Sequence, residues 1–509
     1  MSNRFDFGGV NLRASDQPAS ARPTYETPFC IAILGDFSGR ENRAICEPST
    51  VGERRVWQVD RDNFDEVLSN LHPELQFPTE SGVPLIFRFT ELEDFHPDRL
   101  FNHEAFQKLK SLREQVQDPS TFKSIAERTG ILPAPTNRPL RESARVTAPD
   151  SARLASGSLL DEMIEETESR VPLEPPPRIN EVKEFARQLA AKYAVSAPDV
   201  RQPEVIASVD RAIGDTMRTI LHHPDFQALE AIWRAAFLLV RRLETGSQLK
   251  IFLLDISKQE LAADLRPSEN LRETGIFRQI IDKTVETPGA DPFTIVVGAF
   301  RFGSTIEELQ LLAKLARVAD GGGAVLLAEA DSLLLGCSSI EESPSPRDWK
   351  RPELQSVWET LRLRPESASI GLALPRFLLR LPYGKETSRL DSFDFEECNG
   401  SPNHDDYLWG NPGFVVALMV GQSFEDSGWK MQLGHRSQVE NLPLHSYRVE
   451  GDLRAKPCAE VLLTEEAVER VLEQGLIPLV SYKGRDEVRV GRFQSIAEPP
   501  GLLKGRWNA

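Results

Sequence analysis

The sequence has few cysteines, and their spacing gives them no shared chemical role. Its 509 residues contain five, an odd number with no CxxC pair, so neither a disulfide framework nor a zinc cage is indicated. We expect all five to be small buried apolar residues. The eight histidines include one adjacent pair, His222 and His223, whose side chains would point about 100° apart on a helix and could not bind a metal from one face. We therefore predict no metal site.

Motifs of nucleotide binding and hydrolysis are missing too. The turn Gly35–Gly39 follows an apolar run, but it has neither the Walker lysine nor the GxGxxG spacing. Gly321–Gly323 come after a predicted helix and before a strand, the wrong order for a phosphate site, and indicate a helix stop. No GxSxG is present, and we assign the adjacent Glu396 and Glu397 to a solvated edge. We predict no catalytic residue, no cofactor and no enzymatic activity.

Long apolar runs and an excess of positive charge are absent as well. No stretch approaches the roughly 18 consecutive apolar residues of a membrane span, and the first thirty residues have no apolar signal core. The chain has 60 Lys and Arg against 77 Asp and Glu, a net charge of −17, and such an excess repels nucleic-acid phosphates. We expect a soluble cytosolic protein of about two to four domains, without membrane insertion or nucleic-acid binding.

What is present divides into three parts. The first runs to about residue 130 and alternates strand and helix patterns, which predicts a small α/β unit. Its predicted elements are strands at 29–34, 56–60 and 85–90, a helix from Asp62 through Leu71, and helical spacing from Leu100 to Val116.

The second part, about 131–204, is rich in proline, which excludes continuous helix and predicts a linker. Within it, residues 157–168 have an acidic amphipathic helix pattern. Leu159, Leu160, Met163 and Ile164 form its apolar stripe. A helix this short needs a surface for its stripe, either in its own chain or on a partner protein.

The third part, from about 205, is large enough for a substantial core. Two helical patterns meet at a corner marked by Pro224. Strand patterns at 249–256, 293–298 and 324–327 then alternate with a helix around 311–318. This order again predicts an α/β layer arrangement.

Two sets of motifs carry a resemblance to a known family. PFCIAILGDFSG at 28–39, VDRDNFDEV at 59–67 and LEDFHPD at 92–98 resemble the small sheath subunit, TssB, of bacterial type VI secretion systems. A second set of motifs resembles the large subunit, TssC. Its members are ILHHPDFQALEAIWR at 220–234, DISKQEL at 255–261, PRFLLRLPYG at 375–384 and YLWGN at 407–411. The chain is thus similar to a TssB–TssC fusion.

The resemblance implies two α/β sheath domains, one small and one large, joined by the proline-rich linker. The expected parts are an N-terminal extension at 1–27, a TssB-like domain at 28–130, a linker at 131–204 with its short helix at 157–168, and a TssC-like domain at 205–509 that is short at its C-terminal end.

The function that the resemblance implies is mechanical. Sheath subunits of this family polymerise around an inner tube of Hcp and contract to drive it outward, so the expected partners are other protomers, Hcp and baseplate components. The alternative is a non-polymerising adaptor or cap built from sheath domains. The stripe Leu159, Leu160, Met163 and Ile164 is similar to the segment that the ClpV-type AAA+ ATPase recognises, which makes this ATPase a further expected partner in the bacterial cytoplasm.

Overall fold

The computed structural model describes residues 23–79, 82–119, 121–122, 201–266, 270–303, 305–398, 400 and 402–508. The amphipathic helix expected at 157–168, with its four apolar residues, lies outside these residues. The described residues fall into two compact units. One contains those up to Arg99 together with 219–391 and those from Phe395 onward, and the other contains those within 100–218 and 392–394.

A mixed sheet forms the centre of the first unit. Six neighbouring strands, from β14 (Ile477–Ser481) to β5 (Leu249–Asp255) in sheet order, are parallel, and antiparallel strands flank them on both sides. Among the described residues the sheet has nine strands. In sheet order they are β11 (Gln438–Val439), β15 (Val488–Val490), β14 (Ile477–Ser481), β8 (Ile370–Leu374), β7 (Val325–Ala330), β6 (Ile295–Phe302), β1 (Phe29–Gly35), β5 (Leu249–Asp255) and β2 (Trp57–Val59).

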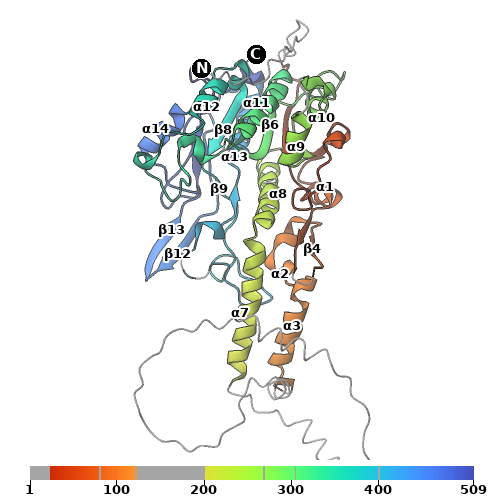
Figure 1. Ribbon diagram of the computed structural model, residues 1–509, viewed down its shortest axis with the longest axis vertical. Helices are drawn as coiled ribbons and strands as arrows, with labels where there is room; N and C mark the ends of the chain where they lie inside the picture. Colours follow the sequence, from red (N-terminus) through yellow and green to blue (C-terminus); the bar gives the residue numbers. More distant parts are fainter. Residues whose placement is uncertain are drawn as a thin grey trace, which may run out of the picture. The chain divides into compact units, whose positions relative to one another are not determined.

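Helices cover both faces of this sheet, which makes a three-layer α/β architecture (Figure 1). On one face, apolar side chains of β1, β6 and β7 share a core with a first set of helices, whose bounds are given below. On the other face, α13 (Pro412–Ser427) packs against β1, β6, β7 and β8, and α8 (Pro224–Arg242) packs against α13. The first set is α9 (Lys258–Leu265), α10 (Gly275–Phe277) with a π-helical turn at Arg278–Asp282, α11 (Ile306–Gly321) and α12 (Gln355–Arg362); the second is α8 (Pro224–Arg242) and α13 (Pro412–Ser427).

Smaller elements complete the first unit. In the part of the chain that the structure describes, three antiparallel pairs lie outside the nine-stranded sheet. They are β3 (Glu74–Phe77) with β4 (Leu85–Arg88), β9 (Phe377–Leu378) with β10 (Trp409–Gly410), and β12 (His445–Val449) with β13 (Asp452–Lys456), and the remaining helices are α1 (Phe64–Leu71), α2 (Pro97–Leu100) and α14 (Glu465–Glu473). No helix in the described ranges is long and apolar enough to cross a membrane.

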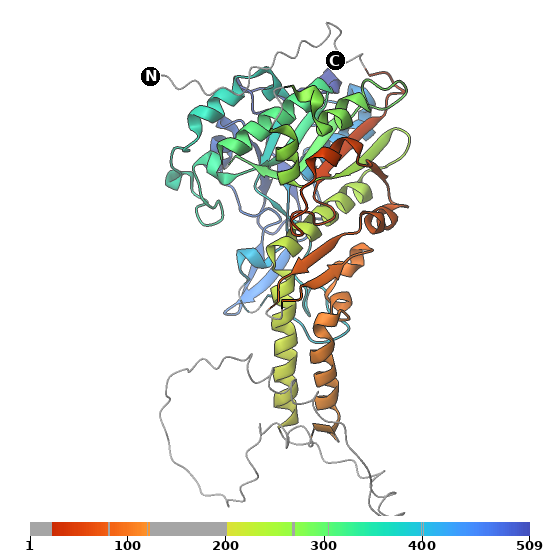
Figure 2. The same cartoon turned by 45° about the vertical axis from the view of Figure 1, so that its right-hand side comes forward.

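The second unit contains a pair of helices, α3 (Glu104–Gln117) and the first part of α7 (Gln202–Leu221), which lie side by side (Figure 1 and Figure 2). The Arg113 guanidinium donates to Asp210 at 2.7 Å. At the end of α3, the buried Gln202 amide donates to the backbone oxygen of Val116 at 2.8 Å. These polar contacts fix the register of the two helices.

The local predictions from the sequence are largely confirmed. The apolar run after Pro28 is strand β1, and the predicted corner lies between α7 and α8, where the His223 side chain caps α8 and Pro224 begins it. The glycine run ends α11 as expected, since Gly323 has a φ of +70°. The α/β class is confirmed as well.

Candidate functional site

Strand β1 lies between β5 and β6, and both neighbours come from the far side of the proline-rich segment. β1 pairs with all of β5 in parallel, from Phe29 opposite Leu249 to Gly35 opposite Asp255. On its other edge it pairs with β6, with Ile31 opposite Ile295. All seven residues of β1 are buried. The first part of the sequence therefore supplies an inner strand to a sheet whose other inner strands come from the third part.

A close approach of backbone and side chain fixes the end of β1. A Cβ atom on Gly35 would lie 2.2 Å from Ile232 Cδ1 of helix α8 and 3.0 Å from Ala299 Cβ. Only glycine allows the helix to pack this tightly on the strand. Just beyond, the buried Trp233 indole donates to the backbone oxygen of Phe37 at 2.9 Å.

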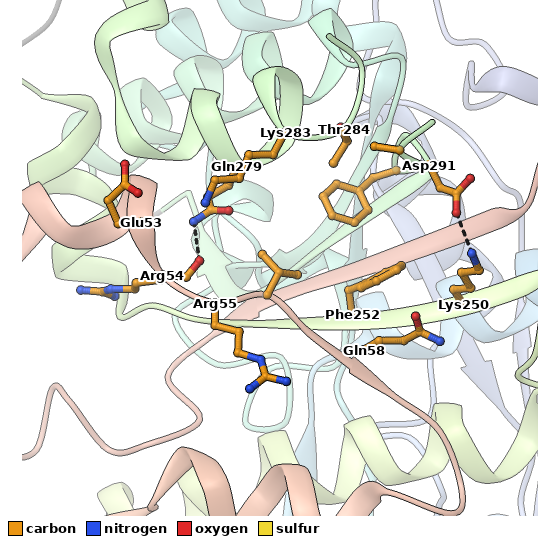
Figure 3. Close-up of a pocket in the computed structure, with 13 residues that line it drawn as sticks. Glu53, Arg54, Arg55, Gln58, Lys250, Phe252, Gln279, Lys283, Thr284 and Asp291 are labelled. Atoms are coloured by element: carbon orange, nitrogen blue, oxygen red, sulfur yellow. Dashed lines mark hydrogen bonds and ion pairs between the residues drawn. The ribbon is translucent and has the colours of Figure 1, made fainter. Parts of the chain in front are cut away.

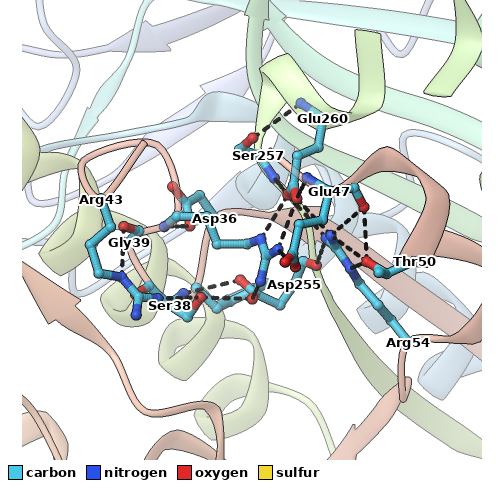
Figure 4. A network of polar contacts seen from close by, with 12 residues as sticks. Asp36, Ser38, Gly39, Arg43, Glu47, Thr50, Arg54, Asp255, Ser257 and Glu260 are labelled. Carbon is cyan, nitrogen blue, oxygen red and sulfur yellow. Dashed lines mark hydrogen bonds and ion pairs between the residues drawn. The ribbon is translucent and has the colours of Figure 1, made fainter. Parts of the chain in front are cut away.

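After β1, the chain turns through a polar network, drawn in Figure 4. The Asp36 carboxylate accepts hydrogen bonds from the backbone nitrogens of Arg40 and Glu41 at 2.7 and 2.8 Å, which closes the turn. The Ser38 hydroxyl donates to Asp255 Oδ2 at 2.7 Å and its backbone nitrogen donates to Oδ1 at 3.0 Å. Burial and the nearby Asp36 carboxyl raise the pKa of Asp255 to about 6.

The centre of the network is the Glu260 carboxylate at the start of α9, whose side chain is 0% exposed. Arg40 donates to it from Nε and Nη2 at 2.8 and 2.9 Å, and Arg54 donates from Nη2 and Nη1 at 2.6 and 3.0 Å. The Glu47 backbone nitrogen adds a bond of 2.9 Å. Burial alone raises the pKa of Glu260, but these donors outweigh it and bring the pKa to about 2.

We call β1, Asp36, Ser38, Arg40, Arg54, Asp255 and Glu260 together the junction. Its polar part lies at the carboxyl ends of β1 and β5, where open α/β sheets commonly bind ligands. Here Glu260 pairs with both guanidinium groups, Arg40 also lies 3.0 Å from Glu47 and 3.9 Å from Asp255, and the Ser38 hydroxyl donates to the Asp255 carboxylate. The geometry is that of a link between two parts of a chain.

A second group of contacts joins residues 51–54 to α10 and to the π-helical turn that follows it. The Gln279 side-chain amide donates to the backbone oxygens of Val51 and Arg54 at 2.7 and 2.8 Å. A Cβ atom on Gly275 would lie 2.5 Å from the backbone nitrogen of Gly52. Here too the two parts of the sequence are in direct backbone contact.

A buried ionic cluster corrects one prediction. Glu397, assigned from the sequence to a solvated edge, is 1% exposed and accepts hydrogen bonds from Arg380 at 2.7 and 2.9 Å. Arg380 also donates to Glu230 of α8 at 2.8 Å, and Arg234 donates to the same Glu230 at 2.6 Å. Burial raises the pKa of Glu397, but the Arg380 charge outweighs it and brings the pKa to about 2. The prediction was wrong because Arg380, 17 residues earlier in the sequence, contacts Glu397 in the folded chain.

The cysteine prediction is confirmed only in part. Cys30, Cys337 and Cys458 are buried, but Cys46 is exposed and Cys398 is half-buried. Within the described part of the chain, no group of three or more His, Cys, Asp or Glu side chains is placed to hold a metal ion. The four stripe residues Leu159, Leu160, Met163 and Ile164 lie outside the described residues.

Sequence reasoning missed the residues of the junction that matter most. Arg40, Arg54 and Glu260 were not singled out, because ion pairs over such a separation leave no periodic signal. One local signal was available: Ser257 and Glu260 form a capping box at the start of α9. That pattern predicts the helix start but not the arginine partners.

Both parts of the sequence match known protein families. Residues 203–497, more than half of the chain, match the VipB (EvpB) tail sheath N-terminal domain. Residues 9–124 match the VipA family of type VI secretion systems. The two matches correspond to the two parts of the sequence that meet at the junction.

Two relatives from Pseudomonas aeruginosa are similar to the same parts. The type VI secretion system sheath protein TssC1 is 30% identical over 339 residues, which cover 63% of this chain and 68% of the relative. The sheath protein TssB1 is 26% identical over 110 residues, 20% of this chain, and the match spans 62% of that relative's length. The fold and the matches define a structural sheath protein. The chain belongs to the type VI secretion sheath family and combines a TssB-like and a TssC-like part, consistent with a fusion of the two subunits.

Proposed function

We propose that this chain is the protomer of a contractile sheath that assembles around an Hcp inner tube and contracts to drive the tube outward. The observation that carries the proposal is the position of β1 between β5 and β6. A TssB-like strand completes the TssC-like sheet, so one chain contains a whole structural unit. Contraction needs a unit that keeps its integrity while it moves against its neighbours.

The fusion gives the two parts a fixed one-to-one ratio. Because they belong to one chain, their association is intramolecular and has a high effective concentration. The junction adds a completely buried carboxylate with two arginine partners, which favours one arrangement of the two parts over others. We propose that the TssB-like part at 28–130 and the TssC-like part at 205–509 act together as one mechanical body.

Further partners follow from the family. We propose that the assembled sheath contacts baseplate components and works in the bacterial cytoplasm. We also propose that Leu159, Leu160, Met163 and Ile164 bind a ClpV-type ATPase by helix-in-groove recognition. A peptide of residues 155–170 should bind the cognate ATPase, and a peptide with all four residues changed to Ser should not.

Electron microscopy of the purified full-length chain, with and without Hcp, tests the main proposal. We expect long tubes, in an extended form with Hcp and a shorter, wider form after contraction. Monomers or small closed oligomers under all conditions would contradict it and favour the adaptor or cap that sheath domains could also form.

A further inference from the structure

A pocket of about 510 Å³ opens beside the edge strand β2 (Figure 3). Its wall is apolar where Val56, Phe252 and Phe293 line it. Phe252 and Phe293 meet edge to face, with ring centroids 5.6 Å apart. The volume is in the range of roughly 300–1,000 Å³ that binding pockets commonly have. We call it the edge pocket.

The charged groups around the edge pocket leave an unneutralised positive rim. Lys250 is paired with Asp291 at 2.6 Å, and Arg54 is held by Glu260. Arg55 and Lys283, by contrast, are exposed lining residues. The Arg55 guanidinium lies over the Trp57 ring at 3.7 Å. The rim therefore presents a cation on an aromatic ring and a lysine, next to an apolar wall.

Glu53 is the acidic lining residue nearest to these cations in the sequence. It is exposed and lies 3.8 Å from Arg278 across exposed side chains. Such a pair is weak in water and leaves the positive character of the rim in place. The chemistry of the edge pocket therefore suits an aromatic group that is followed by a carboxylate.

The same chain displays such a group elsewhere. Tyr25 is 89% exposed, the most exposed of the large hydrophobic side chains in the described residues, and the exposed Glu26 follows it. The turn that carries them is held in place. The Thr27 backbone nitrogen donates to the Thr24 oxygen at 3.0 Å, and the Trp429 indole donates to the Thr27 oxygen at 2.8 Å.

We propose that Tyr25 of one copy of this chain inserts into the edge pocket of a second copy, with Glu26 against Arg55 and Lys283. The phenol ring would pack on Phe252 and Phe293, the arrangement of an aromatic anchor in an interface pocket. Because Tyr25 is almost fully exposed, it does not fill the pocket of its own chain.

The contact would join two different patches of the same molecule. Such a heterologous contact leaves Tyr25 unused on one copy and the edge pocket empty on the other. Further copies can therefore add, and the contact extends into a ring or a helical array instead of closing as a dimer. The inference rests on the proposed assembly of copies and adds to it the side chains that meet. The charges are complementary, since Glu26 is acidic and the pocket rim is basic.

Cross-linking of two separate preparations tests the contact directly. Both carry Cys46→Ser, which removes the exposed native thiol. One adds Thr24→Cys, next to Tyr25, and the other adds Gln58→Cys in the pocket lining, so the side chains of the proposed contact are kept. After mild oxidation of the mixture, we expect a disulfide-linked dimer. A mixture of Tyr482→Cys and Gln58→Cys is the matched control, because position 482 is also exposed but lies outside the proposed contact. Equal dimer yields in both mixtures would overturn the proposal.

A charge exchange gives a second, independent readout in the full-length protein. Lys283→Glu should weaken self-association at least tenfold in sedimentation experiments, and adding Glu26→Lys should restore it. Tyr25→Ala should weaken it as much, with an unchanged far-UV spectrum. Self-association that is indifferent to all three variants would overturn the contact.

The contact and the sheath proposal can fail separately. Tubes that form normally with Tyr25→Ala, without a cross-link between positions 24 and 58, would overturn the contact and leave the sheath proposal intact. A specific cross-link in a protein that never forms tubes would support the contact and count against the sheath proposal.

Discussion

Arg54 and Glu260 are 206 residues apart in the sequence, yet their charged groups are joined by two hydrogen bonds of 2.6 and 3.0 Å. The pair spans the two parts of the chain that match different sheath families. Parallel double contacts between guanidinium and carboxylate are among the strongest hydrogen-bonded pairs in proteins. Since Glu260 is completely buried, its partners determine whether the charge can be tolerated.

Removing the charge of Glu260 should be costly. With Glu260→Gln, Arg40 and Arg54 lose a shared buried carboxylate, and we expect the free energy of unfolding to fall by about 3 kcal/mol. Denaturant unfolding of the full-length chain measures this. Glu47→Gln is the control, because its side chain is 59% exposed and pairs with Arg40 at the surface, so it should cost less than about 1 kcal/mol. Equal losses would contradict the central role of Glu260.

Asp255 and Glu260 should affect the pH dependence of stability in opposite directions. The pKa of Asp255 is raised to about 6, so the native state holds this proton more tightly and stability falls as the pH rises from about 4 to 6. The pKa of Glu260 is lowered to about 2, so its contribution is present above its ordinary pKa and is lost as the pH falls from about 4.5 towards 2.

Asp255→Asn tests the first of these effects. We expect the stability of the wild type to fall relative to this variant by on the order of 2 kcal/mol between pH 4 and 6. Chemical denaturation at a series of pH values measures the difference. Asp62→Asn, at an exposed position, should show no such trend. A parallel pair of pH profiles for wild type and Asp255→Asn would refute the assignment.

The tight packing at Gly35 predicts a rescue between two positions. Gly35→Ala places a Cβ atom 2.2 Å from Ile232 Cδ1 and should destabilise the protein by about 1–3 kcal/mol. In the Ile232→Ala background the same change should cost much less, because the clashing atom is gone. Gly246→Ala, with open space around the new Cβ atom, is the control, and a strictly additive double variant would count against the contact.

The inner position of β1 predicts that the two parts stay together without a covalent connection. After cleavage at a protease site placed between residues 131 and 200, the two fragments should still elute together from a size-exclusion column. The physical reason is that β1 is hydrogen-bonded on both edges and all its residues are buried. The change Ile31→Asp before cleavage should let the fragments separate, whereas the exposed change Asp62→Asn should not.

A structural feature could be predicted from the sequence when the residues that produce it are close together along the chain. Strand β1, the Pro224 corner and the glycine stop after α11 were predicted because turns, caps and apolar runs are local. Sheet order is different. Nothing between residues 29 and 35 says that their neighbours will be β5 and β6, and the pattern alone suggested two separate α/β units. The burial of Glu397 was missed for the same reason. Its contact with Arg380, which also donates to Glu230, exists only in the folded chain.

The inner position of β1 in the sheet also affects folding during synthesis on the ribosome. β1 leaves the exit tunnel before the two strands that flank it, which are made roughly 210 and 260 residues later. At about 5–20 residues per second this means a wait on the order of 10–50 s. During that time an apolar strand with two open edges is exposed to other nascent chains and to aggregation. A gene encoding both parts in one chain ensures that the correct partners for this strand arrive on the same polypeptide.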